Sequence, residues 1–527
     1  MKRLVLLLAF FLLCNSLAMS QASFKLFRFG GFEQEKPAVE LTDGTRLDVS
    51  AFGEDYNEHF FATDGIKRLQ TWLASNAAKC PKVAPTERFG SCVARPSKIV
   101  GIGLNYAAHA AESNQPIPKE PVLFLKSTTS LSGPNDNIPT PNRSTKLDWE
   151  AELAIIIGKK ASYVSEADAM SYVAGFATAN DVSERNFQLE RTGQWTKGKS
   201  ADGFCPLGPY LVTTQDIADP QNLNIWLTVN GQKMQQSNTS DMVFGVKQVV
   251  STVSQFMTLL PGDVIVTGTP SGVGLGHKPT VFLKDGDVVA LGIDKLGNQQ
   301  QKVISFVESQ LTPDEYKDYQ AWVGLGLGGL PHTLEGYRTV KMLGKQMKDP
   351  IDVGRVTGDI GSVGDVKGLS KLPKREGQRP QIAPFAVPHR QVNQHNSPEI
   401  RALQQQLFDE KVAKNSPILT YKLSYLEKHN HGIFVADSAS GNPTLMPVSH
   451  AEIGHIHPTD GSMHIILSPS DTKEVIEKGW GELHGLAGQD KAAKTYLMIY
   501  SPRDQKELAV TKKIIDAAVK YSTYVPK

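Results

Sequence analysis

The chain has 527 residues, with 56 lysines and arginines against 54 aspartates and glutamates, giving a formal net charge of +2. This length exceeds one ordinary domain, so we expect two or three. A near-neutral chain without a basic tract disfavours a nucleic-acid partner, and 40% hydrophobic with 21% charged residues is typical of a soluble globular protein.

The amino terminus has the pattern of a secretory signal peptide. Lys2 and Arg3 precede an apolar run from Leu4 to Cys14, and small residues follow up to Ala22. The run is shorter than the roughly 20 residues that a membrane span needs, and no later stretch qualifies. We therefore expect residues 1–22 to direct export to a periplasm or out of the cell, with an uncleaved anchor as the alternative.

Three cysteines remain beyond that segment. In an oxidising compartment Cys80 and Cys92 could pair across an eleven-residue interval and staple a loop, which would leave Cys205 as a lone buried thiol. The sequence contains no Cys-x-x-Cys, so a thiolate zinc site is not expected.

Residues 23–97 have the pattern of a small mixed domain without candidate catalytic residues.

The first motif with candidate catalytic residues follows that domain. A strand from Ile99 runs through a turn containing glycines into a helix over 107–112. His109 and Glu112 are then neighbours on one helical face. A carboxylate beside an imidazole fixes its tautomer and raises its basicity, as a general base for water requires. A surface His–Glu pair is the alternative.

An alternating stretch over 148–158 predicts a strand with an apolar face. Its other face opens with Asp148, Glu150 and Glu152, whose same-face neighbours are about 7 Å apart and repel unless a cation lies between them. A second apolar run, 172–178, leads to Asp181 at a strand end. Three carboxylates with open positions suit a hard divalent cation. A solvated polar face on a half-buried strand is the alternative.

Two later features could contact a substrate. Lys199 near a metal site could hold a substrate carboxylate or an enolate oxygen, whereas alone it would be a solvated charge. The glycine-rich loop 268–276 lacks the Gly-Lys-Ser/Thr of a phosphate-binding loop, and no helix follows it. We expect it to present backbone N–H groups and Thr269 to an anion. Strands are predicted at 224–229 and 264–267, and a closing hairpin at 282–289.

In this order, the motifs resemble the fumarylacetoacetate hydrolase family. The matching pieces are Gly103–Glu112, Phe124–Lys126, Asp148–Ala154, Asn180–Ser183, Lys199–Ser200, Pro261–Ile265 and Thr267–Gly274. They cover about residues 98–305, and residues 23–97 are similar to the family's amino-terminal domain. The resemblance implies an α+β fold, a mainly-β mixed roll, and a homodimer formed through this catalytic domain. The branch that it looks most like comprises ureidoglycolate lyases, acylpyruvate hydrolases and dienedioate isomerases.

The resemblance also implies roles for individual residues. Glu150, Glu152 and Asp181 would hold Mg²⁺ or Mn²⁺, with Ca²⁺ as a further option. His109 and Glu112 would activate water on a mobile lid. The implied substrate contacts are Gln188, Lys199 and Thr269, with Lys199 also catalytic.

The implied reaction is cleavage of a C–C or C–N bond in a small 2-oxo or ureido acid, such as an acylpyruvate or ureidoglycolate, through a metal-stabilised enolate. An isomerase or decarboxylase of a related oxo-dioate is one alternative. The other is an exported ligand-binding protein without catalysis, which would have no use for the His109–Glu112 base.

The second half has a different pattern. Residues 306–383 predict a helical segment and a linker, and residues 384–527 a separate, smaller α/β domain. From about residue 318 the chain resembles a family labelled luciferase-domain proteins, a label that implies no activity here. The motifs are Gly326–Pro331, Pro388–Arg390, His455–Ser462 and Gly479–Glu482.

Three histidines in this half form a candidate second site. His455 and His457 share one strand face, and His464 could join them around a metal. The alternative is a polar strand whose imidazoles bond to their neighbours.

Overall fold

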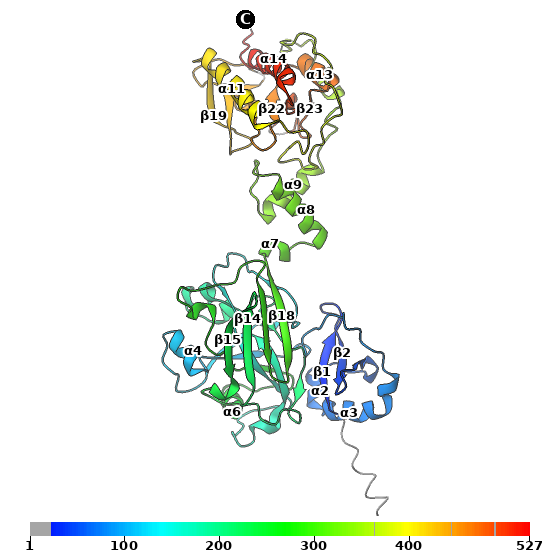
Figure 1. The fold of residues 1–527 in the computed structure, drawn as a ribbon, viewed down its shortest axis with the longest axis vertical. Coiled ribbons are helices and arrows are strands. Elements are labelled where there is room, and N and C mark those ends of the chain that lie inside the picture. Colours follow the sequence, from blue (N-terminus) through cyan, green and yellow to red (C-terminus); the bar gives the residue numbers. More distant parts are fainter. Residues whose placement is uncertain (1–22, 363, 444, 490–491, 527) are drawn as a thin grey trace, which may run out of the picture. The chain divides into compact units, whose positions relative to one another are not determined.

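The computed structural model describes residues 23–362, 364–443, 445–489 and 492–526 (Figure 1). The expected signal peptide, residues 1–22, lies outside the described residues. The chain forms two compact units, the first ending at Gln310 and the second beginning at Leu311. Both contain sheets and helices, so the predicted α+β class is confirmed. None of the described helices is long and apolar enough to cross a membrane.

The first unit opens with a small antiparallel sheet and two helices. The elements are β1 (Phe24–Phe29), β2 (Lys36–Leu41), β3 (Arg46–Asp48), α2 (Glu58–Ala62) and α3 (Gly65–Asn76). Their apolar residues form one core with Cys92 and Cys205, both fully buried. Cys80, Cys92 and Cys205 are free thiols. The Cys80–Cys92 disulfide that the sequence leaves open is therefore not formed, and the Cys80 thiol donates to the carbonyl oxygen of Asn76 at 3.4 Å.

The rest of the first unit is built on a six-stranded sheet. In spatial order its strands are β13 (Val212–Thr213), β10 (Val173–Asn180), β9 (Ala151–Ile157), β16 (Val264–Val266), β4 (Ile99–Gly103) and β5 (Val122–Lys126). Every residue of β9 and β10 is buried. A strand covered on both faces reads as a nearly continuous apolar run, and both segments do.

A second, five-stranded sheet packs against the first. Its strands, in spatial order, are β15 (Gln232–Asn238), β14 (Asn224–Val229), β17 (Val288–Ile293), β18 (Gly297–Ile304) and β7 (Ile138–Pro139); β15, β14 and β18 are labelled in Figure 1. Leu153 and Ile155 of β9 share a core with Leu227 and Leu291 of this sheet. Helix α6 (Val246–Phe256) adds Val249 to the same core.

Two sequence-based expectations differ from this fold. The strand predicted over 148–158 is split, because β8 (Leu147–Asp148) ends before β9 begins at Ala151. The hairpin predicted at 282–289 is formed instead by β17 and β18. The turn around Gly286 only leads into it, since the Gly286 N–H donates to the carbonyl oxygen of Val303.

The second unit combines helices with a six-stranded antiparallel sheet. The strands, in spatial order, are β19 (Leu419–Leu423), β20 (His431–Val435), β21 (Glu452–Ile456), β22 (Met463–Ile466), β24 (Tyr496–Ile499) and β23 (Gly481–Leu483). The helices include α8 (Pro313–Gly324), α9 (Leu334–Gly344), α11 (Pro398–Lys414), α13 (Pro469–Glu477) and α14 (Gln505–Ser522).

One feature of this unit follows from local sequence and another from tertiary packing. Thr312 and Glu315 form a reciprocal capping box that begins α8 where the sequence predicts a helix. Within the segment expected as a linker, Leu369 and Leu372 are buried in the core of this unit. This part of the segment therefore belongs to the core of the second unit despite its glycine- and proline-rich composition.

Candidate functional site

Three carboxylates converge at one end of the central sheet of the first unit. Glu150 immediately precedes β9, Glu152 lies within it, and Asp181 directly follows β10, the antiparallel neighbour of β9. The Asp181 N–H donates to the carbonyl oxygen of Glu150 at 2.9 Å, which fixes the two segments together. One oxygen from each side chain lies within 4.8 Å of the others, and all three side chains are buried. The structure thus brings together the three predicted metal ligands.

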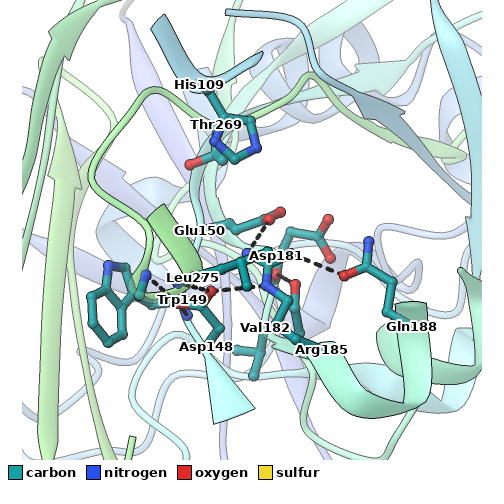
Figure 2. A network of polar contacts seen from close by, with 12 residues as sticks. His109, Asp148, Trp149, Glu150, Asp181, Val182, Arg185, Gln188, Thr269 and Leu275 are labelled. Carbon is teal, nitrogen blue, oxygen red and sulfur yellow. Dashed lines mark hydrogen bonds and ion pairs between the residues drawn. The ribbon is translucent and has the colours of Figure 1, made fainter. Parts of the chain in front are cut away.

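Cationic side chains surround two of these carboxylates. Lys199 Nζ donates to Glu150 Oε2 at 2.6 Å and to Asp181 Oδ2 at 2.8 Å. Arg185 Nη2 lies 2.7 Å from Glu150 Oε1, and Lys126 Nζ forms an ion pair with Asp181 (Figure 2 shows Glu150, Asp181 and Arg185). Although burial alone would raise it, Lys199 and Arg185 hold the pKa of Glu150 below its ordinary value.

Glu152, unlike Glu150 and Asp181, has no cationic side chain bonded to it among the described residues. Its Oε2 accepts the backbone N–H of Gly268 at 2.7 Å, and within the described part of the chain it forms no ion pair with Lys, Arg or His. Burial, and then the charges of Asp181 and Glu150, raise the pKa of Glu152 well above its ordinary value. A divalent cation between the three side chains would supply the missing positive charge, and an all-oxygen ligand set suits Mg²⁺, Mn²⁺ or Ca²⁺. The residues therefore fit such an ion.

The His109–Glu112 pair forms as predicted on helix α4 (Ala107–Glu112). His109 Nδ1 lies 2.8 Å from Glu112 Oε1, and Glu112 Oε2 accepts the backbone N–H of Gly272 at 2.8 Å. In Figure 2, His109 and Thr269 lie across an open space from Asp181 and Gln188. With Nδ1 bonded to Glu112, the Nε2 atom of His109 is left for other partners.

One cavity of about 270 Å³ brings together His109 of the predicted catalytic pair and the predicted substrate contacts. It is lined by His109, Glu150, Glu152, Gln188, Lys199 and Thr269, together with Arg185, Phe124 and Trp195. The predicted substrate contacts are therefore in place around the carboxylates.

The predicted substrate contacts differ in their free hydrogen-bonding capacity. Gln188 Oε1 accepts from Arg185 Nη1 at 3.0 Å, and Figure 2 shows its amide nitrogen directed toward the open space. The Thr269 hydroxyl already donates to the carbonyl oxygen of Ala151 at 3.0 Å and accepts from Gln235 at 2.8 Å. Gln188 is thus a better placed donor to a substrate than Thr269.

Sequence reasoning missed the roles of Asp148, Lys126 and Arg185. Asp148 accepts the backbone N–H groups of Gly274 at 2.6 Å and Leu275 at 3.0 Å, and Arg185 Nε at 2.8 Å. It therefore anchors the glycine-rich loop rather than joining the ligand set. The sequence offered one indication. Lys126 lies on the same strand face as Phe124, and Arg185 follows Asp181 by four residues, so each needs an acidic partner if its segment is buried.

The three histidines predicted as a second site also come together, in the second unit. Ring nitrogens of His455, His457 and His464 lie within 4.8 Å of one another and of a carboxylate oxygen of Glu427. All four side chains are buried. Glu427 lies between β19 and β20 and was not anticipated as part of this group.

Comparisons with known proteins match both halves of the chain. Residues 98–304 match the family model described as Fumarylacetoacetate (FAA) hydrolase C-terminal, and residues 450–518 match that of the Luciferase domain. A protein of Burkholderia ambifaria named as a putative hydrolase is 51% identical over 278 residues, which are 53% of this chain and 98% of that relative.

Solved structures also resemble the first half. A fumarylacetoacetate hydrolase from Exiguobacterium antarcticum is 35% identical, covering 54% of this chain and 100% of that chain, with a TM-score of 0.46. Maleylpyruvate hydrolase from Sphingobium sp. SYK-6, in complex with manganese(II) ion and pyruvate, is 30% identical, covering 53% of this chain and 99% of that chain, with a TM-score of 0.45.

Proposed function

Since this chain belongs to the fumarylacetoacetate hydrolase family, we propose that its first unit is a divalent-metal-dependent hydrolase that cleaves a carbon–carbon bond of a small acylpyruvate-type 2-oxo acid. One observation carries the proposal. Two of the buried carboxylates and His109 line the same cavity, and the third carboxylate, Asp181, is bonded to Lys199 on the cavity wall. A metal site and a base for water thus face a single substrate volume.

Glu150, Glu152 and Asp181 would hold the ion, with Mg²⁺ and Mn²⁺ both suited to their oxygen atoms. When bound, such an ion supplies Lewis-acid polarisation of the 2-oxo acid and offsets the negative charge that develops as the carbon–carbon bond breaks. In this chain, the feature that favours a bound divalent ion is Glu152, whose carboxylate has no cationic partner among the described residues.

His109 and Glu112 are suited to activate the attacking water. Glu112 accepts the Nδ1 proton of His109, so Nε2 is free to take a proton from water at the cavity. The Glu112 carboxylate then stabilises the imidazolium that forms. Addition of the resulting hydroxide to the acyl carbonyl, followed by C–C cleavage and protonation of the released carbon, yields a carboxylate and pyruvate.

The cavity also fits the substrate class. Its volume of about 270 Å³ suits a small acid, and its cationic wall suits a carboxylate. A lysine ammonium has three donors, of which Lys199 uses two on Glu150 and Asp181. The third donor and the Gln188 amide can bind substrate oxygens.

Turnover of a panel of acylpyruvates in the presence of Mg²⁺ or Mn²⁺ tests the proposal, with products identified by NMR. The expected products are pyruvate and the matching carboxylate. The Glu150→Gln variant should lose turnover, whereas Glu190→Gln, at an exposed glutamate, should keep it. Equal turnover by Glu150→Gln and the wild type would refute the metal-dependent mechanism. Binding without consumption would identify a ligand-binding protein, and an isomerised or decarboxylated product would identify one of those enzymes.

A further inference from the structure

The second unit contains a histidine cluster, defined here as His455, His457 and His464, outside the site described above. His455 on β21 and His464 on β22 are direct cross-strand partners. His457 directly follows β21, two residues beyond His455, so continued extended backbone places both side chains on the same side. The three ring centroids are 4.7–5.3 Å apart, and none of the side chains is more than 3% exposed.

The Nδ1 atom of each imidazole is hydrogen-bonded to a residue outside the histidine cluster. His455 Nδ1 lies 2.6 Å from Glu452 Oε1, and His464 Nδ1 lies 2.8 Å from the Tyr496 hydroxyl. His457 Nδ1 lies 2.8 Å from the Ser462 hydroxyl. Histidines that bind metals are commonly oriented in this way, with the nitrogen that is not a ligand bonded to a carboxylate or another acceptor.

The inward nitrogens of two of these rings have no partner. Nε2 of His455 and Nε2 of His457 are buried, and neither has a hydrogen-bond partner in the described chain. Since Glu452 accepts from His455, and the Ser462 hydroxyl donates to Asp460, both Nδ1 atoms carry the proton. Both Nε2 atoms therefore present lone pairs. Unpaired buried nitrogens are rare in native proteins, and two in one cluster indicate an absent partner rather than a polar strand satisfied by its neighbours.

Glu427 completes the donor set. Its Oε1 lies 3.8 Å from His457 Nε2, and Arg390 holds both of its oxygens, at 3.0 and 2.6 Å. The guanidinium offsets the charge of Glu427, while the outer carboxylate of Glu452 adds negative charge beside the rings.

We propose that His455, His457, His464 and Glu427 bind a divalent transition-metal ion, with Zn²⁺ as the representative case. Three imidazoles and one carboxylate suit Zn²⁺ and its transition-metal neighbours, whereas Mg²⁺ and Ca²⁺ prefer all-oxygen sites. Nε2 of His464 lies 3.2 Å from His389 Nδ1, and metal binding replaces that contact.

The proposed ion lies beside a cavity of about 500 Å³ within the same unit. Glu427 and His464 both line this cavity, and its other walls include Leu330, Leu343, Val387 and Tyr496. The four protein donors fill a tetrahedral zinc site, so a small molecule in this cavity would reach the ion only as a fifth ligand.

The metal alone is the probe in the test. Full-length protein is stripped with a chelator and titrated with Co²⁺, whose visible spectrum is intense in a tetrahedral imidazole site and weak in a six-coordinate oxygen site. We expect one equivalent of Co²⁺ with intense bands, displaced by Zn²⁺. The bands should persist in Glu150→Gln, so the result does not depend on the site in the first unit.

His457→Asn is the decisive variant, because asparagine keeps a donor near the Nδ1 position toward Ser462 and lacks Nε2. It should abolish the intense bands, whereas His431→Asn, at an exposed histidine of the same unit, should leave them unchanged. Glu452→Gln, which alters the outer partner of His455 and leaves all four proposed ligands in the sequence, should weaken Co²⁺ binding by about 10–100-fold. This second variant keeps the test informative if His457→Asn does not fold.

Three results would overturn the proposal: wild-type protein without intense Co²⁺ bands, bands that survive in His457→Asn, or affinity unchanged in Glu452→Gln. His464 also lies within 4.8 Å of ligand atoms of His389 and His484. Bands kept by His457→Asn but lost in His484→Asn would assign the ion to that other group of histidines instead.

Discussion

His109 Nδ1 and Glu112 Oε1 lie 2.8 Å apart, three residues from each other on helix α4. The second oxygen of the same carboxylate accepts the N–H of Gly272 in the glycine-rich loop. Glu112 therefore both orients the base and fixes α4 to the loop that closes the cavity. Loss of this one carboxylate affects proton transfer and loop position together.

Glu112→Gln should lower kcat by about 10²–10⁴-fold with little change in KM, because general-base assistance is lost while the amide oxygen can still accept the Gly272 N–H and keep the loop in place. Steady-state kinetics on the acylpyruvate that the wild type turns over checks this. His109→Gln alone should be as inactive as the variant that combines His109→Gln with Glu112→Gln, since the two residues act as one unit. His59→Gln, at an exposed histidine on α2, serves as the matched control. A Glu112→Gln enzyme with wild-type kcat would show that the pair is only structural.

Gly272→Ala should destabilise the first unit and lower its activity. Gly272 has φ +101°, and a Cβ there would lie 2.0 Å from the carbonyl oxygen of Met234. Gly286 has φ +91° with open space around it, so Gly286→Ala measures backbone strain alone, about 1–3 kcal/mol. Thermal unfolding should show a larger loss of Tm for Gly272→Ala than for Gly286→Ala. Equal losses would mean that the loop moves to accept the methyl group.

Lys199→Gln should reduce turnover by about 10²-fold while leaving Mn²⁺ binding at least as tight as in the wild type. The lysine contributes a donor to substrate oxygens, yet its ammonium also competes with the metal for Glu150 and Asp181. Calorimetric titration with Mn²⁺ and kinetics separate the two effects. Lys197→Gln removes an exposed lysine of the same short helix and should change neither. Weaker Mn²⁺ binding in Lys199→Gln would contradict the competition.

The buried thiols should be inert in the native protein. Burial raises the pKa of Cys92 and of Cys205 to about 12, and both side chains are fully buried. At pH 8.5 iodoacetamide should therefore modify Cys80 much faster than either, as mapped by mass spectrometry. A Cys80–Cys92 disulfide in the same map would contradict the structure.

The pH dependence of stability follows from the same two thiols. Since their folded pKa is raised above the ordinary value of 9.0, the folded state keeps protons that the unfolded chain releases. The stability that they contribute is present below pH 9 and is lost as pH rises toward 12. Cys92→Ser and Cys205→Ser variants should show a shallower loss of Tm across that window than the wild type.

Much of the site could be predicted because its residues are close in sequence or follow strands with clear patterns. His109 and Glu112 are one helical turn apart, and Asp181 ends an apolar run that could only be a buried strand. Lys126 and Arg185 could not be placed, since a lysine or arginine is normally solvated and their partners come from other segments.

Spacing in the sequence alone did not decide three other features. The interval between Cys80 and Cys92 allowed a disulfide, but Cys92 is packed into a core with Cys205. Likewise, the turn residues around Gly286 indicated a hairpin without specifying which strand would pair with which. In the second unit, the His-x-His pattern identified two donors and could not indicate Glu427, which comes from a loop preceding β20.

The central claim is that Glu150, Glu152 and Asp181 share one divalent ion within reach of His109. The most direct measurement is an anomalous difference map from a crystal of the full chain soaked in Mn²⁺. We expect a single strong peak in the first unit, about 2.0–2.3 Å from one oxygen of each of the three carboxylates. A peak held by other residues, or no peak among these oxygens at saturating Mn²⁺, would contradict the proposed enzyme mechanism.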